Sequence, residues 1–147
     1  MSDATDYLGL VISEDHEETI NRFSAPPASF AASFDTPDEW TPPIEVWQQA
    51  RTSSCVGHFQ AAAFTHRQFV ETGEMIRYSP WFGYITSQKE GGFFGKDRGT
   101  SISSALIAAT KYGSCLESLC SNPGHYDTTI AAAAYADAEQ HKHVGAC

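Results

Sequence analysis

Four residues recur along one helical face in the first stretch with a clear pattern, at steps of four, three and four: Phe59, Ala63, His66 and Val70. Ser53 or Ser54 precedes this stretch, and serine side chains often cap the first amides of a helix. Gly73 follows it, and glycine readily takes the left-handed conformation that ends a helix. The pattern predicts a helix of about five turns between these signals, with Cys55 in its first turn.

The next stretch carries the signals of a second, shorter helix. Ser79 is placed as a cap, and Pro80 fits the first helical position, where an N–H is not needed. Gly91 and Gly92 mark the end. Between these signals, four residues recur at helical spacing: Trp81, Tyr84, Ile85 and Gln88.

Two further helices follow. Thr100 or Ser101 caps the third helix, and Gly113 ends it. Its apolar stripe contains five residues: Ile102, Ala105, Leu106, Ala109 and Tyr112. After a loop, the Ala-rich stretch 128–143 is a good intrinsic helix former. The sequence therefore predicts a mainly α protein.

The region before these helices has a different composition. Residues 24–43 carry most of the chain's prolines, and proline excludes both helix and central strand. Residues 1–43 are therefore predicted to be an extended Pro-rich lead-in, and residues 44–147 a single domain. A chain of 147 residues is long enough to bury one core of its own.

The charge balance disfavours some classes of partner. The chain has 18 acidic and 9 basic residues, a net charge of -9, which disfavours contact with nucleic-acid phosphates. The N-terminus lacks the basic and apolar regions of a secretory signal, and no run of about 18 apolar residues is present to span a membrane. We expect a soluble, cytoplasmic protein that binds neither nucleic acid nor membrane.

The four cysteines are too few and too irregularly spaced for a dense disulfide framework. Cys115 and Cys120 are interpreted as core thiols or, in an oxidising compartment, as a short-range disulfide. The spacing of the thiols and imidazoles in the tail matches no common zinc-binding pattern. These residues are Cys115, Cys120, His125, His141, His143 and Cys147. We expect no metal and no cofactor.

Cys55 is the residue best placed for nucleophilic chemistry. A cysteine attacks a carbonyl only as the thiolate, and the amides and dipole at the start of a helix stabilise that anion. The tetrahedral intermediate needs two donors for its oxyanion, commonly the nucleophile's own backbone amide and a side-chain amide on the preceding loop. Gln49 stands six residues earlier and is a candidate for the second donor. The structural alternative for Cys55 is a buried thiol.

The segment QARTSSCVGHFQAAAF resembles the nucleophile segment of the papain-like cysteine peptidases, in which a glutamine stands six residues before the cysteine that opens the long helix. The segments that follow are similar in order: SPWFGYI, then GGFFGKDRGTSISSALIAATKYG, then SCLES, with the GTSI part similar to bacterial and phage-type members. The resemblance implies the helical left lobe of the papain-like α+β fold. It also implies a peptidase with Cys55 as nucleophile and Gln49 in the oxyanion hole.

A peptidase must also hold a peptide or protein substrate beside its nucleophile. The Gly-rich loop GGFFGKDRG is the best candidate for this groove, because glycine lets another backbone approach closely. The predicted groove residues are Gly91, Gly92, Gly99 and Thr100.

Three features depart from the family pattern. Thr52 stands where secreted members have a disulfide cysteine, and Val56 where they have a tryptophan. The family's base histidine and orienting asparagine lie about 130 to 150 residues after the nucleophile, on a β-rich right lobe, whereas this chain stops at residue 147. That lobe is therefore expected to be absent from this chain, which is truncated or is completed by a second chain with His and Asn, or self-associates. The isolated chain should be weakly active at most.

Three alternatives stay open. The first is that His58, which is near enough along the helix, acts as a local base, although no third group is visible to orient it. His66 is instead interpreted as a core or lobe-interface residue. A degenerate lobe that binds proteins without chemistry fits the same pattern. So does an acyl transfer other than proteolysis, of the amidase or transglutaminase type.

Overall fold

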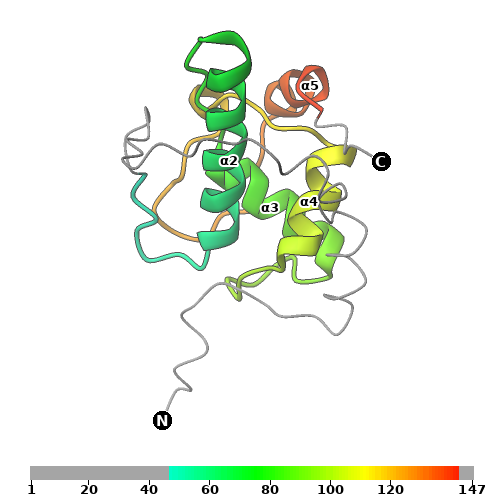
Figure 1. Ribbon diagram of the computed structural model, residues 1–147. Helices are drawn as coiled ribbons and strands as arrows, with labels where there is room; N and C mark the ends of the chain where they lie inside the picture. Colours follow the sequence, from blue (N-terminus) through cyan, green and yellow to red (C-terminus); the bar gives the residue numbers. More distant parts are fainter. Residues whose placement is uncertain (1–46, 143–147) are drawn as a thin grey trace, which may run out of the picture.

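A computed structural model describes residues 47–142, which form α-helices and one short 3-10 helix (Figure 1). The predicted lead-in 1–43 and the predicted lack of a secretory signal concern residues outside this part. In chain order the elements are α2 (Cys55–Thr72), α3 (Pro80–Gly91), α4 (Ile102–Lys111), the 3-10 helix Glu117–Leu119 and α5 (Ala132–Gln140). Residues 47–142 contain no strand, although an isolated antiparallel bridge joins Tyr78 and Leu116. The expected mainly α architecture is confirmed for this part of the chain.

α2 begins and ends where its sequence signals predict. Ser54 is the N-cap, and Gly73 is the C-cap, where a φ of 76° lets the Gly73 N–H reach the Phe69 carbonyl at 2.8 Å. The start differs from the expectation in one respect, because the Ser54 hydroxyl does not bond a helix amide. It pairs with the Thr52 hydroxyl at 2.8 Å instead, so this serine stabilises the turn before Cys55 rather than the helix end.

The face that α2 buries is not its apolar stripe. Phe59 and Val70 are 58% and 68% exposed, and the buried residues are Val56, Gly57, Gln60, Ala61 and Thr65. The reason is the close crossing of α3: a Cβ on Gly57 would lie 2.3 Å from the Pro80 carbonyl oxygen. At this crossing only a glycine fits between α2 and α3, while the apolar side chains of Phe59 and Val70 lie on the exposed side of α2.

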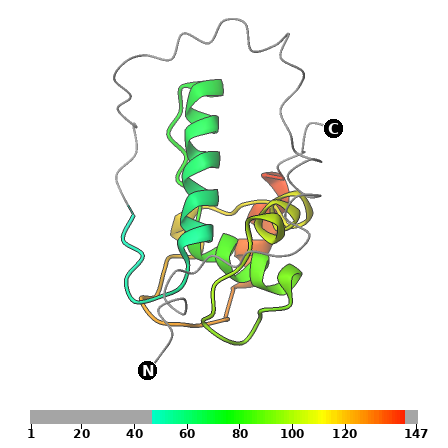
Figure 2. The same cartoon turned by 60° about the horizontal axis from the view of Figure 1, so that its bottom comes forward.

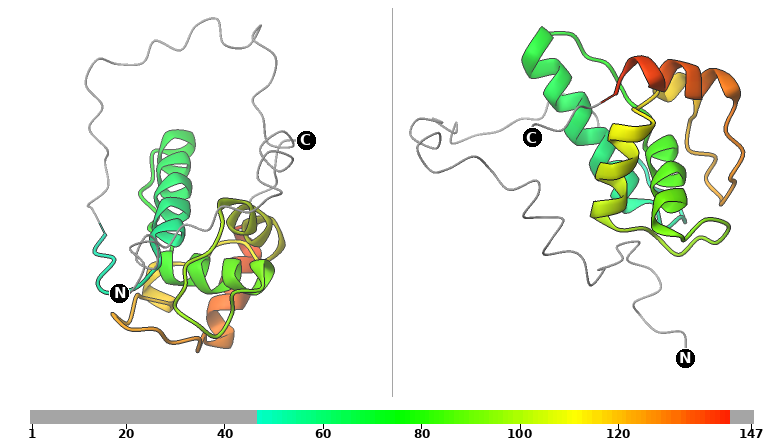
Figure 3. Two further views of the ribbon diagram at one scale, coloured as in Figure 1. Left: turned by 90° about the horizontal axis from the view of Figure 1, so that it is seen from below. Right: turned by 90° about the vertical axis from the view of Figure 1, so that its right-hand side faces the viewer.

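α3 lies at the centre of the fold and contacts both α2 and α4 (Figures 2 and 3). Its predicted ends are confirmed. The Ser79 hydroxyl accepts the Phe82 N–H at 2.9 Å, and Pro80 occupies the first helical position. Gly92 ends the helix with a φ of 73°. All residues from Pro80 to Gln88 are buried, as in a helix with no solvent-facing side.

α4 also follows its predicted signals. Ser101 caps the helix by accepting the Ser104 N–H at 3.1 Å, and Gly113, at a φ of 83°, follows the C-cap Tyr112. The buried face is made of small residues: Ser103, Ser104, Ala105, Ala108 and Ala109. It includes Ala105 and Ala109 of the predicted stripe but none of its larger members. Leu106 is only half-buried, because the face turned to α3 carries only serines and alanines.

The fourth predicted helix is wrong in its extent. The prediction began at residue 128, whereas α5 begins at Ala132. The Asp127 carbonyl accepts the Trp81 indole N–H at 3.0 Å, and the Asp127 carboxylate accepts the Thr129 N–H at 2.8 Å. These bonds hold the preceding residues outside a helix, and tertiary contacts therefore override the local helix propensity.

The core lies around α3. Its buried cluster consists of Trp81, Phe82, Tyr84, Ile85, Cys115, Cys120, Ala134 and Ala138. α5 contributes only alanines, Ala134 and Ala138, to this buried cluster. Within residues 47–142, no helix combines the length and the apolar character of a membrane span.

Candidate active site

Cys55 is the first residue of α2, at the end of the helix where backbone N–H groups have no carbonyl partner within the helix. Its side chain is half-buried. Burial raises the pKa of the Cys55 thiol above its ordinary value, while hydrogen bonds from the backbone N–H groups of Val56 and of Cys55 itself lower it in part. Burial has the larger effect, so the start of the helix does not by itself produce a thiolate at neutral pH.

We expect alkylation of Cys55 by iodoacetamide to be slow near about pH 7 and to have a midpoint above that of an unfolded cysteine, because only the thiolate reacts. The rate is measured by mass spectrometry of the tryptic peptide 52–67 between about pH 6 and pH 10. The urea-unfolded chain supplies the reference for the same peptide. A midpoint below that reference would show that this chain stabilises the thiolate without a partner.

Gln49 lies in a turn before Cys55. Its side-chain Nε2 donates to the Thr52 carbonyl at 2.6 Å, while its own carbonyl accepts from the Thr52 hydroxyl at 2.8 Å and from the Asn122 amide at 3.2 Å. Ala50 has a φ of 58°, a left-handed conformation that costs about 1–2 kcal/mol outside glycine. Nε2 carries two hydrogens, and the one that Thr52 does not use is the one that an oxyanion would receive. The oxyanion role stays a prediction.

The loop after α3 is tied to the segment that precedes Cys55. The Asp97 carboxylate accepts the Ser53 N–H at 2.9 Å and the Tyr84 hydroxyl at 2.7 Å. Burial and the hydrogen bond to Asp97 raise the pKa of Tyr84 far above its ordinary range, so the hydroxyl stays protonated and continues to donate. Asp97 therefore fixes the residues just before Cys55, a role that the spacing of residues along the sequence does not indicate.

Gln88, fully buried in α3, holds the same loop at other points. Its Nε2 donates to the carbonyls of Lys96 at 2.9 Å and Gly99 at 3.0 Å, and its Oε1 accepts the Tyr126 hydroxyl at 2.7 Å. A polar residue within an apolar stripe is the sequence signal for such a role, because a buried amide requires partners. The loop conformation therefore depends on a side chain from the core.

The four predicted groove residues lie at the two ends of this loop. Gly91 is the last residue of α3, and Gly92 is exposed. Gly99 and Thr100 are buried, and Gly99 has a φ of 79°. The part of the loop open to a ligand is therefore on the Gly92 side, while Gly99 and Thr100 support it from the interior. Substrate contact at these residues stays a prediction.

His58 is bonded to the turn before α2. Its Nδ1 lies 2.9 Å from the Ser54 carbonyl oxygen and 3.3 Å from the Ser54 hydroxyl oxygen, so the ring donates to the carbonyl in the tautomer protonated at Nδ1. Its Nε2 is buried and has no hydrogen-bond partner. These contacts favour a structural role for His58 over a role as local base. His66 lies half-buried on α2.

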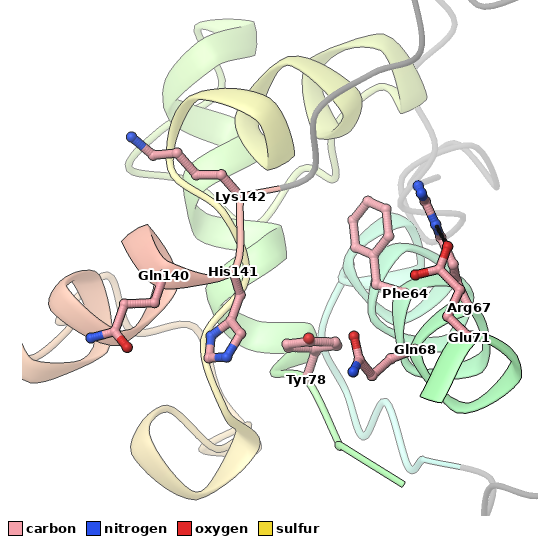
Figure 4. A pocket seen from close by; sticks show the side chains of 8 residues that line it. All are labelled: Phe64, Arg67, Gln68, Glu71, Tyr78, Gln140, His141 and Lys142. Atoms are coloured by element: carbon pink, nitrogen blue, oxygen red, sulfur yellow. Dashed lines mark hydrogen bonds and ion pairs between the residues drawn. The ribbon is translucent and has the colours of Figure 1, made fainter. Parts of the chain in front are cut away.

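A pocket of about 340 Å³ lies between the C-terminal half of α2 and the end of α5 (Figure 4). Its lining residues are Phe64, Arg67, Gln68, Glu71, Tyr78, Gln140, His141 and Lys142. Phe64 is separated from Cys55 by about 13 Å of helical rise, so this pocket is distinct from the predicted groove. Among residues 47–142, no group of three or more His, Cys, Asp or Glu side chains is arranged so that it could hold a metal ion.

A solved structure has the same arrangement of helices. The chain is similar to xylellain, a cysteine protease from Xylella fastidiosa, with 25% sequence identity and a TM-score of 0.63. The similarity covers 69% of this chain and 44% of that chain, so this chain corresponds to less than half of the protease. No family model matches the sequence, and no curated protein matches it. The expected fold class is confirmed: the described residues form the helical lobe of a papain-like fold.

Proposed function

We propose that this chain is the nucleophile lobe of a papain-like cysteine peptidase. The observation that carries the proposal is the position of Cys55, which opens α2 in a lobe similar to part of a cysteine protease and whose sulfur accepts hydrogen bonds from the backbone N–H groups of Val56 and of Cys55 itself. The glutamine six residues earlier lies in a hydrogen-bonded turn. Both groups are held by local backbone structure, as a preorganised site requires.

In the proposed reaction, the Cys55 sulfur attacks the carbonyl carbon of a peptide bond. The oxyanion accepts hydrogen bonds from the Cys55 backbone N–H and from Gln49 Nε2, and the amine leaves to give a thioester. Water then hydrolyses the thioester. Because burial raises the pKa of Cys55, the reaction needs an imidazole to take the thiol proton and later protonate the leaving amine.

We propose that a β-rich lobe on a second chain supplies this imidazole and its orienting asparagine. The outward face of α2 supports this proposal, because Phe59 and Val70 are largely exposed on it. Exposed apolar side chains on one face mark a surface for a partner. This face begins one turn after Cys55, so a lobe bound there would lie next to the nucleophile. Self-association is the other way to cover it.

The test is labelling by an epoxide-type cysteine-peptidase inhibitor. The purified chain is treated alone and in lysate of the source cell, and the tryptic peptide 52–67 is examined for the label, with Cys55→Ala as the control. We expect labelling of Cys55 in lysate only. Phe59→Glu should remove this labelling without changing the circular dichroism spectrum, because a charge on the outward face of α2 blocks docking.

No labelling of Cys55 under either condition would contradict the proposal and favour the second candidate, a protein-binding lobe without chemistry. The raised pKa of Cys55 is the observation that favours this alternative. Labelling with turnover of an amide or acyl-transfer substrate, but not of peptides, would identify the acyl-transfer alternative. We propose that the protein acts in the cytoplasm, whether as a peptidase or as an acyl transferase.

A further inference from the structure

Two buried thiols, Cys115 and Cys120, belong to the core around α3. Cys115 is fully buried and Cys120 is 8% exposed. The interaction between the two thiols raises the pKa of Cys115 and lowers the pKa of Cys120. Their sulfurs are therefore already neighbours in the folded chain, and a bond between them requires no approach of distant segments.

One residue fixes the backbone of both cysteines. The N–H of Ser79, the N-cap of α3, donates to the Cys115 carbonyl at 2.8 Å, and its hydroxyl donates to the Cys120 carbonyl. Between the cysteines, the Leu119 N–H donates to the Leu116 carbonyl at 3.0 Å. The segment that joins the two thiols is thus a compact turn anchored to α3.

The two thiols differ in their access to a pocket and in their pKa. Cys120 lines a pocket of about 300 Å³, which Trp81 and Asp127 also line, whereas Cys115 is closed off. The interaction with Cys115 and the Ser79 hydroxyl lower the pKa of Cys120, while the same pairing and burial raise the pKa of Cys115. Cys120 is therefore both the accessible sulfur and the one that ionises first.

We propose that Cys115 and Cys120 are a disulfide-forming site that reacts with small neutral or cationic disulfides through the Cys120 pocket. The Cys120 thiolate attacks one sulfur of the reagent RS–SR, which forms a mixed disulfide and expels RS⁻. Cys115 gives its proton to the expelled thiolate and attacks the Cys120 sulfur, which expels the second RS⁻. The second RS⁻ takes from water the proton that Cys120 released when it ionised. The two cysteine sulfurs lose two electrons in total, and the reagent gains them as two thiols.

Asp127 gives the pocket its charge preference. A hydrogen bond from the Thr129 N–H lowers the pKa of the Asp127 carboxylate, which is therefore ionised at neutral pH. An anionic disulfide is repelled by this carboxylate, and a cationic one is attracted. The site should therefore discriminate between reagents of the same size and opposite charge.

The test treats the full chain with cystamine and then blocks the remaining thiols. The tryptic peptide 112–142 holds Cys115 and Cys120 but neither Cys55 nor Cys147. We expect this peptide to lose about 2 Da, as two thiols become one disulfide. Further cleavage after Glu117 separates the two cysteines, and the fragments should stay joined until a reductant is added. A peptide that keeps both thiols, or that retains cystamine at Cys120, would overturn the proposal.

Single variants test which thiol attacks. Cys115→Ser should leave a stable mixed disulfide at Cys120, whereas Cys120→Ser should leave Cys115 unmodified. Modification of Cys115 in the Cys120→Ser chain would refute the assigned order, provided that the circular dichroism spectrum is native.

The charge preference is tested by comparing cystamine with the anionic 3,3′-dithiodipropionate, with each rate divided by that of the urea-unfolded chain. Cystamine should react several-fold faster, and Asp127→Asn should reduce the difference, whereas equal rates would overturn the charge selection.

Discussion

Replacing Gly57 with alanine is expected to destabilise the fold by about 3 kcal/mol or more. The new Cβ would lie 2.3 Å from the Pro80 carbonyl oxygen and 2.8 Å from the Cβ and the backbone nitrogen of Tyr84. None of these atoms can move away by a side-chain rotation, so α2 and α3 must separate. Helix propensity alone predicts that Gly57→Ala would stabilise the fold by about 1 kcal/mol. The two arguments therefore predict changes of opposite sign in the free energy of unfolding, and we expect the steric clash to be the larger effect.

The measurement is urea unfolding followed by circular dichroism. Gly73→Ala is the matched control, because Gly73 also has a special backbone role but no atom lies within 4 Å of an added Cβ. Its φ of 76° is disfavoured for alanine, so this variant should lose only about 1–2 kcal/mol. If Gly57→Ala is as stable as the original chain, the close crossing of α2 and α3 is wrong.

Replacing Gln88 with leucine is expected to cost about 3 kcal/mol and to release the loop after α3. Leucine has a similar volume but leaves the carbonyls of Lys96 and Gly99 and the hydroxyl of Tyr126 without the partner that Gln88 provides. Each buried polar group that loses its partner costs on the order of 1 kcal/mol. The loop also holds the Ser53 N–H through Asp97, so its release should loosen the turn before Cys55.

Limited trypsin digestion measures the release, because cleavage after Lys96 and Arg98 falls within the loop. Urea unfolding gives the change in the free energy of unfolding. Gln60→Leu is the matched control: the Gln60 amide is also buried, but neither of its polar atoms has a partner. Removing an unsatisfied amide should leave stability unchanged or raise it. Equal losses in the two variants would show that the hydrogen bonds of Gln88 do not hold the loop.

Local signals along the sequence were sufficient for the limits of three helices. Gly73 and Gly92 end α2 and α3 in the left-handed conformation, and Ser79 and Ser101 cap α3 and α4 with their hydroxyls. These devices act within one helical turn, and therefore the residue type and its position are enough to predict them. The same reasoning placed Cys55 at the start of α2.

Partners distant in the sequence decided the remaining features. Spacing shows that Phe59 and Val70 share a face of α2, but the close crossing at Gly57 turns that face outward. The alanines of the predicted fourth helix have high helix propensity, but the β-branched residues 128–130 before them have less, and the hydrogen bond from Trp81 fixes the Asp127 carbonyl, so α5 begins only at Ala132. A propensity of a few tenths of a kcal/mol per residue cannot compete with burial or with a buried hydrogen bond.

The candidate site likewise has features that follow from the local sequence and features that follow from tertiary contacts. The sequence by itself determined the place of Cys55, the proposed nucleophile, at a helix start, because the start of a helix depends on neighbours within a few residues. Only the tertiary structure revealed that Asp97 and Gln88 hold the loop beside it, since these hydrogen bonds join residues brought together by packing. The raised pKa of Cys55 also belongs to the tertiary structure, because burial is a property of the whole fold and outweighs the local effect of the helix start.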